Sequence, residues 1–239
     1  MGFDKPLAGQ IAMVTGGSRG IGFAIANRLA ILGADVAICA RNETNLESAA
    51  RELQNHSVRV FAAPADMMIG GEISAFIAAA REALGEFDIV VNNAGIGIFM
   101  PGYKATEEQW DCVLDTNLKA VFLVCRAVAP GMIERRRGHI INIASLAGKN
   151  SFAGGAIYCA SKWGLLGFTQ SLAEDLRGAG VRVAAICPGS VATEFSPHAG
   201  KDISKLLQPE DVAHAVETLV TQAPESFISE ILLRPTQKP

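Results

Sequence analysis

The sequence lacks the features that mark several classes of protein. Its five cysteines show no C-x-x-C spacing, which argues against a zinc site or a disulfide framework and favours reduced, mostly buried thiols. No run of uncharged apolar residues approaches the length of a membrane span. The formal net charge of −3 leaves no electrostatic footprint for nucleic acid. We therefore expect no metal, no membrane and no nucleic-acid partner.

Signals for export or lipid attachment are also missing. Asp4 and Lys5 interrupt the start of the chain, and no cationic stretch precedes an apolar one, so we expect no secretory signal. Gly2 follows Met1, but Pro6 stands where myristoylation needs Ser or Thr. There is no low-complexity linker, repeat or break in composition. We predict a cytoplasmic protein with a single domain over residues 1–239.

Short apolar runs alternate with longer amphipathic segments, which is typical of repeated strand–helix units. The hydrophobic content of 49% is mostly aliphatic and suits a parallel sheet buried on both faces. The predicted helices lie near 21–32, 43–54, 71–84, 107–134, 157–177 and 209–220. The predicted strands are Ile11–Val14, Val36–Cys39, Val58–Ala62, Ile89–Val91, His139–Ile143, Val181–Ile186 and Glu230–Leu233. This pattern predicts an α/β protein, one doubly wound Rossmann domain with about seven parallel strands and helices on both faces.

A glycine-rich turn directly follows the first predicted strand. Residues 15–22 read TGGSRGIG and open the first helix. Glycines let the backbone approach a pyrophosphate, and a helix N-terminus favours its negative charge. The position between the first strand and the first helix predicts a dinucleotide-binding turn. Its spacing, T-G-x-x-x-G-x-G, differs from the common G-x-G-x-x-G.

The residues at the end of the second predicted strand bear on whether the dinucleotide is NAD(H) or NADP(H). NAD sites usually carry a carboxylate there, but residues 39–42 read CARN. Arg41, with Arg19 of the turn, could form a pocket for a 2′-phosphate, because arginine suits phosphate recognition. Alternatively, Arg41 is a solvated loop cation. We predict NADP(H) in preference to NAD(H).

Tyr158 and Lys162 are four residues apart on a predicted helix, with Ser145 upstream. Side chains at i and i+4 share one helix face. An ammonium beside a phenol favours the phenolate, which would lower the tyrosine pKa towards working pH. Ser145 could hold a carbonyl oxygen while Tyr158 delivers its proton. Taken alone, such a pair is usually an aromatic and a solvated cation on one helix.

Together these motifs resemble those of a known family. The glycine turn, Asn92-Asn93-Ala94-Gly95 after the fourth strand, Ser145, Tyr158-x-x-x-Lys162 and Pro188-Gly189 after the sixth strand occur in the order seen in non-extended short-chain dehydrogenases/reductases. The resemblance covers about residues 7 to 220. It includes the 3-oxoacyl-(acyl-carrier-protein) reductases and NADPH-dependent carbonyl reductases.

The resemblance implies roles for individual residues. Tyr158 would be the general acid/base, Ser145 the hydrogen-bond donor to the carbonyl, and Lys162 a ligand of the nicotinamide ribose that also lowers the Tyr158 pKa. Asn117 would help to hold a proton-relay water. The cofactor contacts carried over, besides Tyr158 and Lys162, are Gly16, Ser18, Arg19, Gly20, Ile21, Arg41, Asp66, Met67, Asn93, Ala94, Gly95, Pro188, Gly189, Val191 and Thr193.

Two departures from the family pattern affect the substrate loop and assembly. Only residues 194–208 separate Thr193 from Pro209, so the loop over the substrate is short. The C-terminal stretch Glu230–Pro235 lacks the usual glycine-rich ending that supports tetramer packing. We therefore expect a homodimer or homotetramer, with the dimer through the helices near 107–134 and 157–177 the safer prediction.

The predicted function is reduction of a ketone or aldehyde to an alcohol, or the reverse. One alternative is a 3-oxoacyl-(acyl-carrier-protein) reductase, with the charged run Glu134–Arg137 attracting an acidic carrier; those cations could equally face water at a helix end. Hydroxysteroid, sugar or polyol oxidation shares the chemistry. A non-catalytic nucleotide sensor is a different class, which tends to lose the tyrosine or lysine. Residues that could line an apolar pocket, or equally be core, are Phe99, Met100, Leu146, Phe152, Ile157 and Trp163.

Overall fold

The computed structural model describes residues 5–195 and 202–237 and contains the predicted parallel sheet. The seven strands lie in the order β3-β2-β1-β4-β5-β6-β7, and every neighbouring pair is parallel. This order confirms the doubly wound prediction. The strands are β1 (Ile11–Thr15), β2 (Asp35–Ala40), β3 (Val60–Pro64), β4 (Ile89–Asn92), β5 (Gly138–Ile143), β6 (Val181–Pro188) and β7 (Glu230–Leu233).

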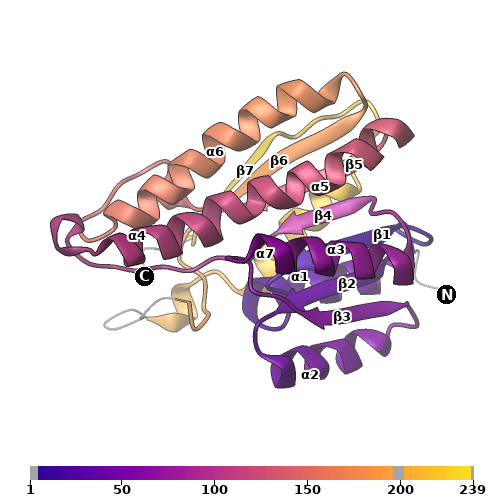
Figure 1. Ribbon diagram of the computed structural model, residues 1–239, viewed down its shortest axis with the longest axis horizontal. Coiled ribbons are helices and arrows are strands. Elements are labelled where there is room, and N and C mark those ends of the chain that lie inside the picture. The colour runs from indigo at the N-terminus through magenta and orange to yellow at the C-terminus, as the bar shows by residue number, and fades with distance from the viewer. Residues whose placement is uncertain (1–4, 196–201, 238–239) are drawn as a thin grey trace.

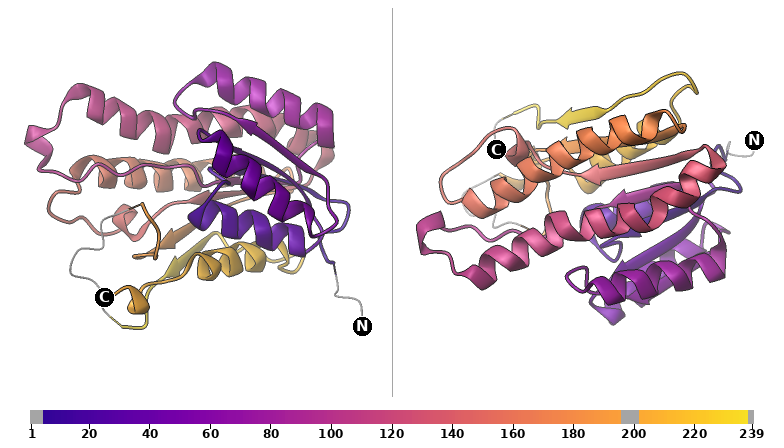
Figure 2. Two further views of the ribbon diagram at one scale, coloured as in Figure 1. Left: turned by 90° about the horizontal axis from the view of Figure 1, so that it is seen from below. Right: turned by 45° about the horizontal axis from the view of Figure 1, so that its top comes forward.

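Helices cover both faces of the sheet (Figures 1 and 2). One layer holds α1 (Gly20–Ile31), α2 (Glu43–Gln54) and α7 (Pro209–Val220), and the other holds α3 (Gly70–Leu84), α5 (Ala120–Arg135) and α6 (Ala156–Arg177). The short α4 (Glu107–Leu114) precedes α5. Thr106 and Gln109 form a capping box at the start of α4, and Pro209 begins α7.

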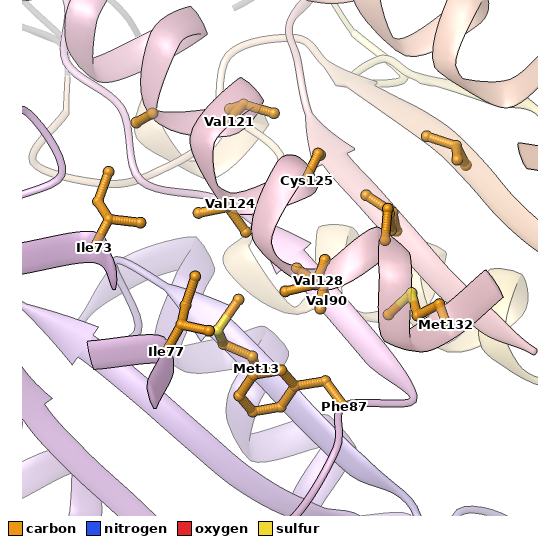
Figure 3. Packing of buried hydrophobic residues seen from close by; sticks show 14 of the residues in the cluster. Met13, Ile73, Ile77, Phe87, Val90, Val121, Val124, Cys125, Val128 and Met132 are labelled. Atoms are coloured by element: carbon orange, nitrogen blue, oxygen red, sulfur yellow. The ribbon is translucent and has the colours of Figure 1, made fainter. Parts of the chain in front are cut away.

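Each face of the sheet buries its own set of side chains. On β1, Met13 points into the α3–α5–α6 layer while Ala12 and Val14 point into the α1–α2–α7 layer, as the period of two requires. Figure 3 shows part of the cluster in the first of these layers, where Val128 of α5 lies beside Val90 of β4. Burial on both faces explains the long aliphatic runs of the strands.

The third strand begins later than predicted. The sequence predicts Val58–Ala62, but β3 runs from Val60 to Pro64. The register on β2 sets this position, because Val36 pairs with Val60. Arg59 therefore lies outside the strand and binds Asp35 instead. Its backbone N–H donates to Asp35 Oδ1 (2.7 Å) and its Nε donates to Asp35 Oδ2 (2.9 Å).

The helix predicted over 107–134 has a break in its regular turns. A π-helical segment, Asp115–Lys119, separates α4 from α5. Asn117 lies in this segment and is fully buried, with its carboxamide bound to the chain after β4. Such π segments occur often at functional sites. The prediction missed it because the cause is a contact with a distant part of the chain.

Several sequence-based expectations concern cysteines, metals and membranes. All five cysteines are free, and four of them are buried. Among the described residues, no group of three or more His, Cys, Asp or Glu side chains is placed to hold a metal ion. No helix within residues 5–195 and 202–237 combines the length and the apolar character needed to cross a membrane.

Candidate active site

A large cavity opens where the carboxyl ends of the strands meet. Its volume is about 1420 Å³. It lies at the point where the strand order reverses between β1 and β4, which is where ligands bind in open α/β sheets. The cavity brings together nearly all of the predicted site residues: Gly16, Ser18, Arg19, Gly20, Ile21, Arg41, Asp66, Met67, Asn93, Ala94, Gly95, Ser145, Tyr158, Lys162, Pro188, Gly189, Val191 and Thr193.

The backbone conformation of the glycine turn would let a ligand approach its main chain closely. Gly16 and Gly20 have φ of +65° and +55°, in the left-handed region. A Cβ on Gly22 would lie 2.1 Å from the Gly16 carbonyl oxygen, so any other residue there would force the backbone to move. Asn93 fastens the turn to β4 by donating from Nδ2 to the carbonyl oxygens of Thr15 (2.9 Å) and Gly16 (3.2 Å). This arrangement fits a pyrophosphate at the start of α1.

Both arginines predicted to bind a 2′-phosphate lie at the cavity, each next to a carboxylate. Arg41 Nη1 is 4.0 Å from Asp66 Oδ2, and Arg19 pairs with Glu194. The two guanidinium groups are about two-thirds exposed. Exposed ion pairs of this kind contribute only ~0–1 kcal/mol, so a phosphate dianion can displace either carboxylate at little cost.

Asp66 and Met67 follow β3 at the same end of the cavity. Asp66 Oδ1 accepts a hydrogen bond from the Met68 backbone N–H (2.9 Å), and Met67 is buried. The carboxylate therefore holds its own turn in place as well as facing the cavity. The adenine contact that the resemblance implies for Asp66 stays a prediction.

Tyr158 lies near the start of α6 and is only 8% exposed. Burial raises the pKa of its phenol to about 12, although hydrogen bonding with Ser145 acts in the opposite direction. The expectation that Lys162 lowers the Tyr158 pKa is wrong, because burial raises it. The ammonium Nζ is 5.9 Å from the ring centroid, so burial outweighs it.

Lys162 is buried in the floor of the cavity. Its Nζ donates to the backbone carbonyl oxygen of Ile143 (2.9 Å). Burial lowers the pKa of this ammonium to about 8, with the Cys187 thiol opposing the effect. No carboxylate of the described chain lies within ion-pair distance of it. The lysine is thus a buried cation directed at a cavity that fits a ligand with hydroxyl or phosphate oxygens.

Asn117 does not line the cavity. It is fully buried, accepts from the Ile96 backbone N–H (2.8 Å), and donates to the Ile96 carbonyl (2.9 Å) and to Ser161 Oγ (3.0 Å). Ser161 in turn donates to the Tyr158 carbonyl (2.8 Å). These bonds tie the loop after β4 to the first turn of α6. The water-holding role implied for Asn117 stays a prediction.

The segment after β6 closes the cavity on its other side. The backbone N–H of Gly189 donates to the Leu233 carbonyl (2.9 Å), and Val191 bridges to Leu207. The chain then turns at Thr193, whose side chain lies 3.4 Å from where a Cβ on Gly20 would be. The segment from Gly189 to Thr193 is therefore anchored to β7 and faces the glycine turn. Part of the short loop predicted over 194–208, residues 196–201, lies outside the described residues.

The sequence identified only part of the substrate end. Phe99, Leu146 and Phe152 line the cavity as one alternative predicted. Ile157 is core, Trp163 is exposed on α6, and Met100 does not reach the lining. The additional lining residues that sequence reasoning missed are Asn150, Ser151, Phe195, Arg234, Pro235, Thr236 and Gln237. Of these, only Phe195 could have been predicted from the sequence, because it is an aromatic residue two positions after Thr193.

Comparison with known proteins places these features in a family. The family model for short chain dehydrogenases matches residues 10–204. An uncharacterized oxidoreductase of Staphylococcus aureus is 37% identical over 232 residues, covering 96% of this chain and 98% of the relative.

Solved structures agree with that assignment. A metagenomic short-chain oxidoreductase in complex with NADP is 45% identical, with a TM-score of 0.87 and coverage of 98% of this chain and 100% of that one. A variant of the actinorhodin polyketide ketoreductase with NADPH is 35% identical, with a TM-score of 0.87 over 95% and 96% of the two chains. This chain is an oxidoreductase that belongs to the short-chain dehydrogenase family.

Proposed function

We propose that this protein reduces a ketone or aldehyde to an alcohol with NADPH, or runs the reverse reaction with NADP⁺. The observation that carries the proposal is the convergence of Tyr158, Ser145 and Lys162 at one end of a cavity whose other end holds the glycine turn and Arg41. Solved relatives with NADP or NADPH support the choice of cofactor.

The residues at the β1–β2 end would hold the dinucleotide. The backbone of the glycine turn would bind the pyrophosphate, and Arg41 and Arg19 the 2′-phosphate, replacing Asp66 and Glu194 as their partners. Asn93 keeps the turn in its open form. When bound, NADPH supplies the hydride. The protein's task at this end is to bind and orient it.

Tyr158 would deliver the proton to the carbonyl oxygen. A phenol with a pKa of about 12 is protonated throughout the neutral range, so the acid form that reduction requires is the one present. Ser145, which lines the cavity beside Tyr158, would donate to the same oxygen as negative charge develops on it. The buried ammonium of Lys162 would bind the ribose and, with that ligand in place, favour transfer of the tyrosine proton.

The charged run Glu134–Arg137 does not favour a carrier protein over a small ketone. The run Glu134–Arg137 lies at the end of α5, just before β5 begins, at the opposite edge of the sheet from the cavity. Arg135 pairs with Glu86 (3.3 Å), and Arg137 pairs with Asp88 (3.2 Å). Arg135 and Arg137 thus form ion pairs within the folded chain. The sensor alternative is also unsupported, since the tyrosine, lysine and serine are all in position.

We further propose a homodimer formed through α4, α5 and α6. Trp110, Phe122 and Trp163 project from these helices and are each more than two-fifths exposed. A second copy would cover them. Light scattering on the purified protein tests this: a Trp163→Glu substitution should convert a dimer to a monomer. A wild-type monomer would contradict it. The predicted cytoplasmic location stays a prediction.

A substrate panel tests the reaction. Ketones, aldehydes and alcohols are assayed with NADPH or NADP⁺, and NADH or NAD⁺ in parallel, by absorbance at 340 nm. We expect carbonyl-dependent oxidation of NADPH with a clear preference over NADH. Failure of every carbonyl and alcohol to change the absorbance would contradict the proposal, and a preference for NADH would overturn the cofactor assignment.

A further inference from the structure

Three phenylalanine rings form a connected cluster beside Tyr158 in the cavity. Phe99 lies 5.4 Å from the Tyr158 ring centroid in an edge-on arrangement, and Phe195 lies 5.7 Å from it. Phe99 is also 6.1 Å from Phe152 and 6.5 Å from Phe195. These separations fall in the range of favourable aromatic contacts. The three rings, which we call the aromatic wall, come from three separate segments of the chain.

The aromatic wall is fixed by the backbone around it. The N–H of Met100 donates to the Gly154 carbonyl oxygen (2.8 Å), which joins the segment carrying Phe99 to the one carrying Phe152. A Cβ on Gly97 would lie 2.6 Å from the Phe99 ring, and one on Gly155 would lie 2.6 Å from the Phe152 ring. Glycine at these two positions leaves the space that the rings occupy.

The rings are not part of the protein core. Phe99, Phe152 and Phe195 are 38%, 48% and 41% exposed, and all three line the cavity. Burying them in the core would stabilise the fold more, so their exposure serves no packing purpose. Contiguous exposed apolar surface inside a cleft marks a ligand-binding groove. Two of the rings, Phe99 and Phe195, pack against the ring of Tyr158, and Phe152 packs against Phe99. A group that contacts the aromatic wall would therefore lie close to the tyrosine that would protonate the carbonyl.

We propose that the substrate is a carbonyl compound whose C=O is bonded to an aromatic or other flat conjugated ring, seated against the aromatic wall. This inference rests on the proposed carbonyl reduction. The carbonyl carbon accepts the hydride of NADPH, and the oxygen takes the Tyr158 proton, giving the alcohol and NADP⁺; the phenolate regains a proton from solvent. A flat ring gains edge-on and offset contacts with the three rings, whereas an aliphatic group gains burial alone.

A matched pair of methyl ketones tests the substrate class. Acetophenone and cyclohexyl methyl ketone differ only in the ring. Their dissociation constants are measured by calorimetry on the NADP⁺ complex, and kcat/KM is measured with NADPH. The proteins compared are wild type, Phe152→Leu and Phe227→Leu, a control that removes a partly exposed ring outside the cavity.

We expect the wild type to bind the phenyl ketone about three- to tenfold more tightly than the cyclohexyl ketone. Phe152→Leu should lose about two- to tenfold of that preference in both measurements, and Phe227→Leu should keep it. Equal or tighter binding of the cyclohexyl ketone overturns the inference, as does an unchanged ratio in Phe152→Leu. Reduction of aliphatic ketones alone overturns it and leaves the proposed function standing. If no carbonyl compound causes NADPH oxidation, both the substrate class and the proposed function are contradicted.

Discussion

The two ends of the cavity are built by different means. The end at β1 and β2 consists of backbone and exposed charges: a glycine turn, fastened by Asn93, and the arginines Arg19 and Arg41. The end at Tyr158 consists of buried ionisable groups and rings brought together from distant segments. The first can bind a polyanion with little rearrangement. The second alters the pKa values of the groups that would carry out the chemistry.

The largest expected effect is at the Tyr158 end. Tyr158→Phe removes the proton donor but keeps the ring in its aromatic surroundings. A general acid contributes ~10²–10⁴-fold, so we expect kcat for carbonyl reduction to fall about 10³-fold. NADPH affinity, measured by fluorescence titration, should stay within about threefold. Turnover close to that of the wild type would remove Tyr158 from the mechanism.

Lys162→Met should lower activity about 10²-fold while stabilising the fold. The folded-state pKa of about 8 lies below the ordinary 10.5, so burying the cation costs free energy below pH 8. We expect the variant to be ~1–3 kcal/mol more stable than the wild type at pH 7 by urea unfolding.

The pH dependence of this difference provides the control. Between about pH 8 and 10.5 the unfolded wild type holds more protons at this position than the folded form, so wild-type stability rises with pH and the advantage of the variant shrinks. In the same way, kcat/KM of the wild type for NADPH should fall as the pH rises through about 8, when Lys162 loses its charge. If the variant is less stable than the wild type at pH 7, the buried ammonium does not lower the free energy of unfolding, and this part of the account is contradicted.

At the other end, Gly22→Ala should damage the turn itself. The new Cβ would lie 2.1 Å from the Gly16 carbonyl oxygen and 2.4 Å from Asn93 Nδ2, so the backbone has to move. We expect a loss of ~1–3 kcal/mol in unfolding free energy together with weaker NADPH binding. Gly71→Ala is the control, since its Cβ meets nothing within 4 Å and should stabilise α3 by ~0.5–1 kcal/mol. Equal stability of the two variants would contradict the close-contact argument.

Arg41→Ala should change cofactor choice and little else. We expect the ratio of NADPH to NADH affinity to fall about tenfold or more, because one of the two cations for the 2′-phosphate is lost. Arg177→Ala, at an exposed ion pair on α6, is the matched control and should leave the ratio unchanged. A preserved NADPH preference in Arg41→Ala would assign the phosphate to other residues.

The same contrast explains what the sequence could predict. The glycine turn, the alternation of strands and helices and the i, i+4 pair of Tyr158 and Lys162 depend on local spacing, and the structure places them as expected. The π segment at Asn117 and the position of Phe195 depend on contacts between segments far apart in the chain. The Tyr158 pKa was predicted in the wrong direction, since spacing reveals the neighbouring lysine but not the extent of burial.

One measurement tests most directly the claim that binding and chemistry are located at opposite ends. The NADPH dissociation constant and the single-turnover rate at saturating NADPH are measured for wild type, Arg41→Ala, Tyr158→Phe and the double variant. We predict that Arg41→Ala weakens only binding, Tyr158→Phe slows only turnover, and the double variant shows both effects at their single-variant sizes. Tyr158→Phe turning over at the wild-type rate, or either substitution altering both quantities, would contradict the account.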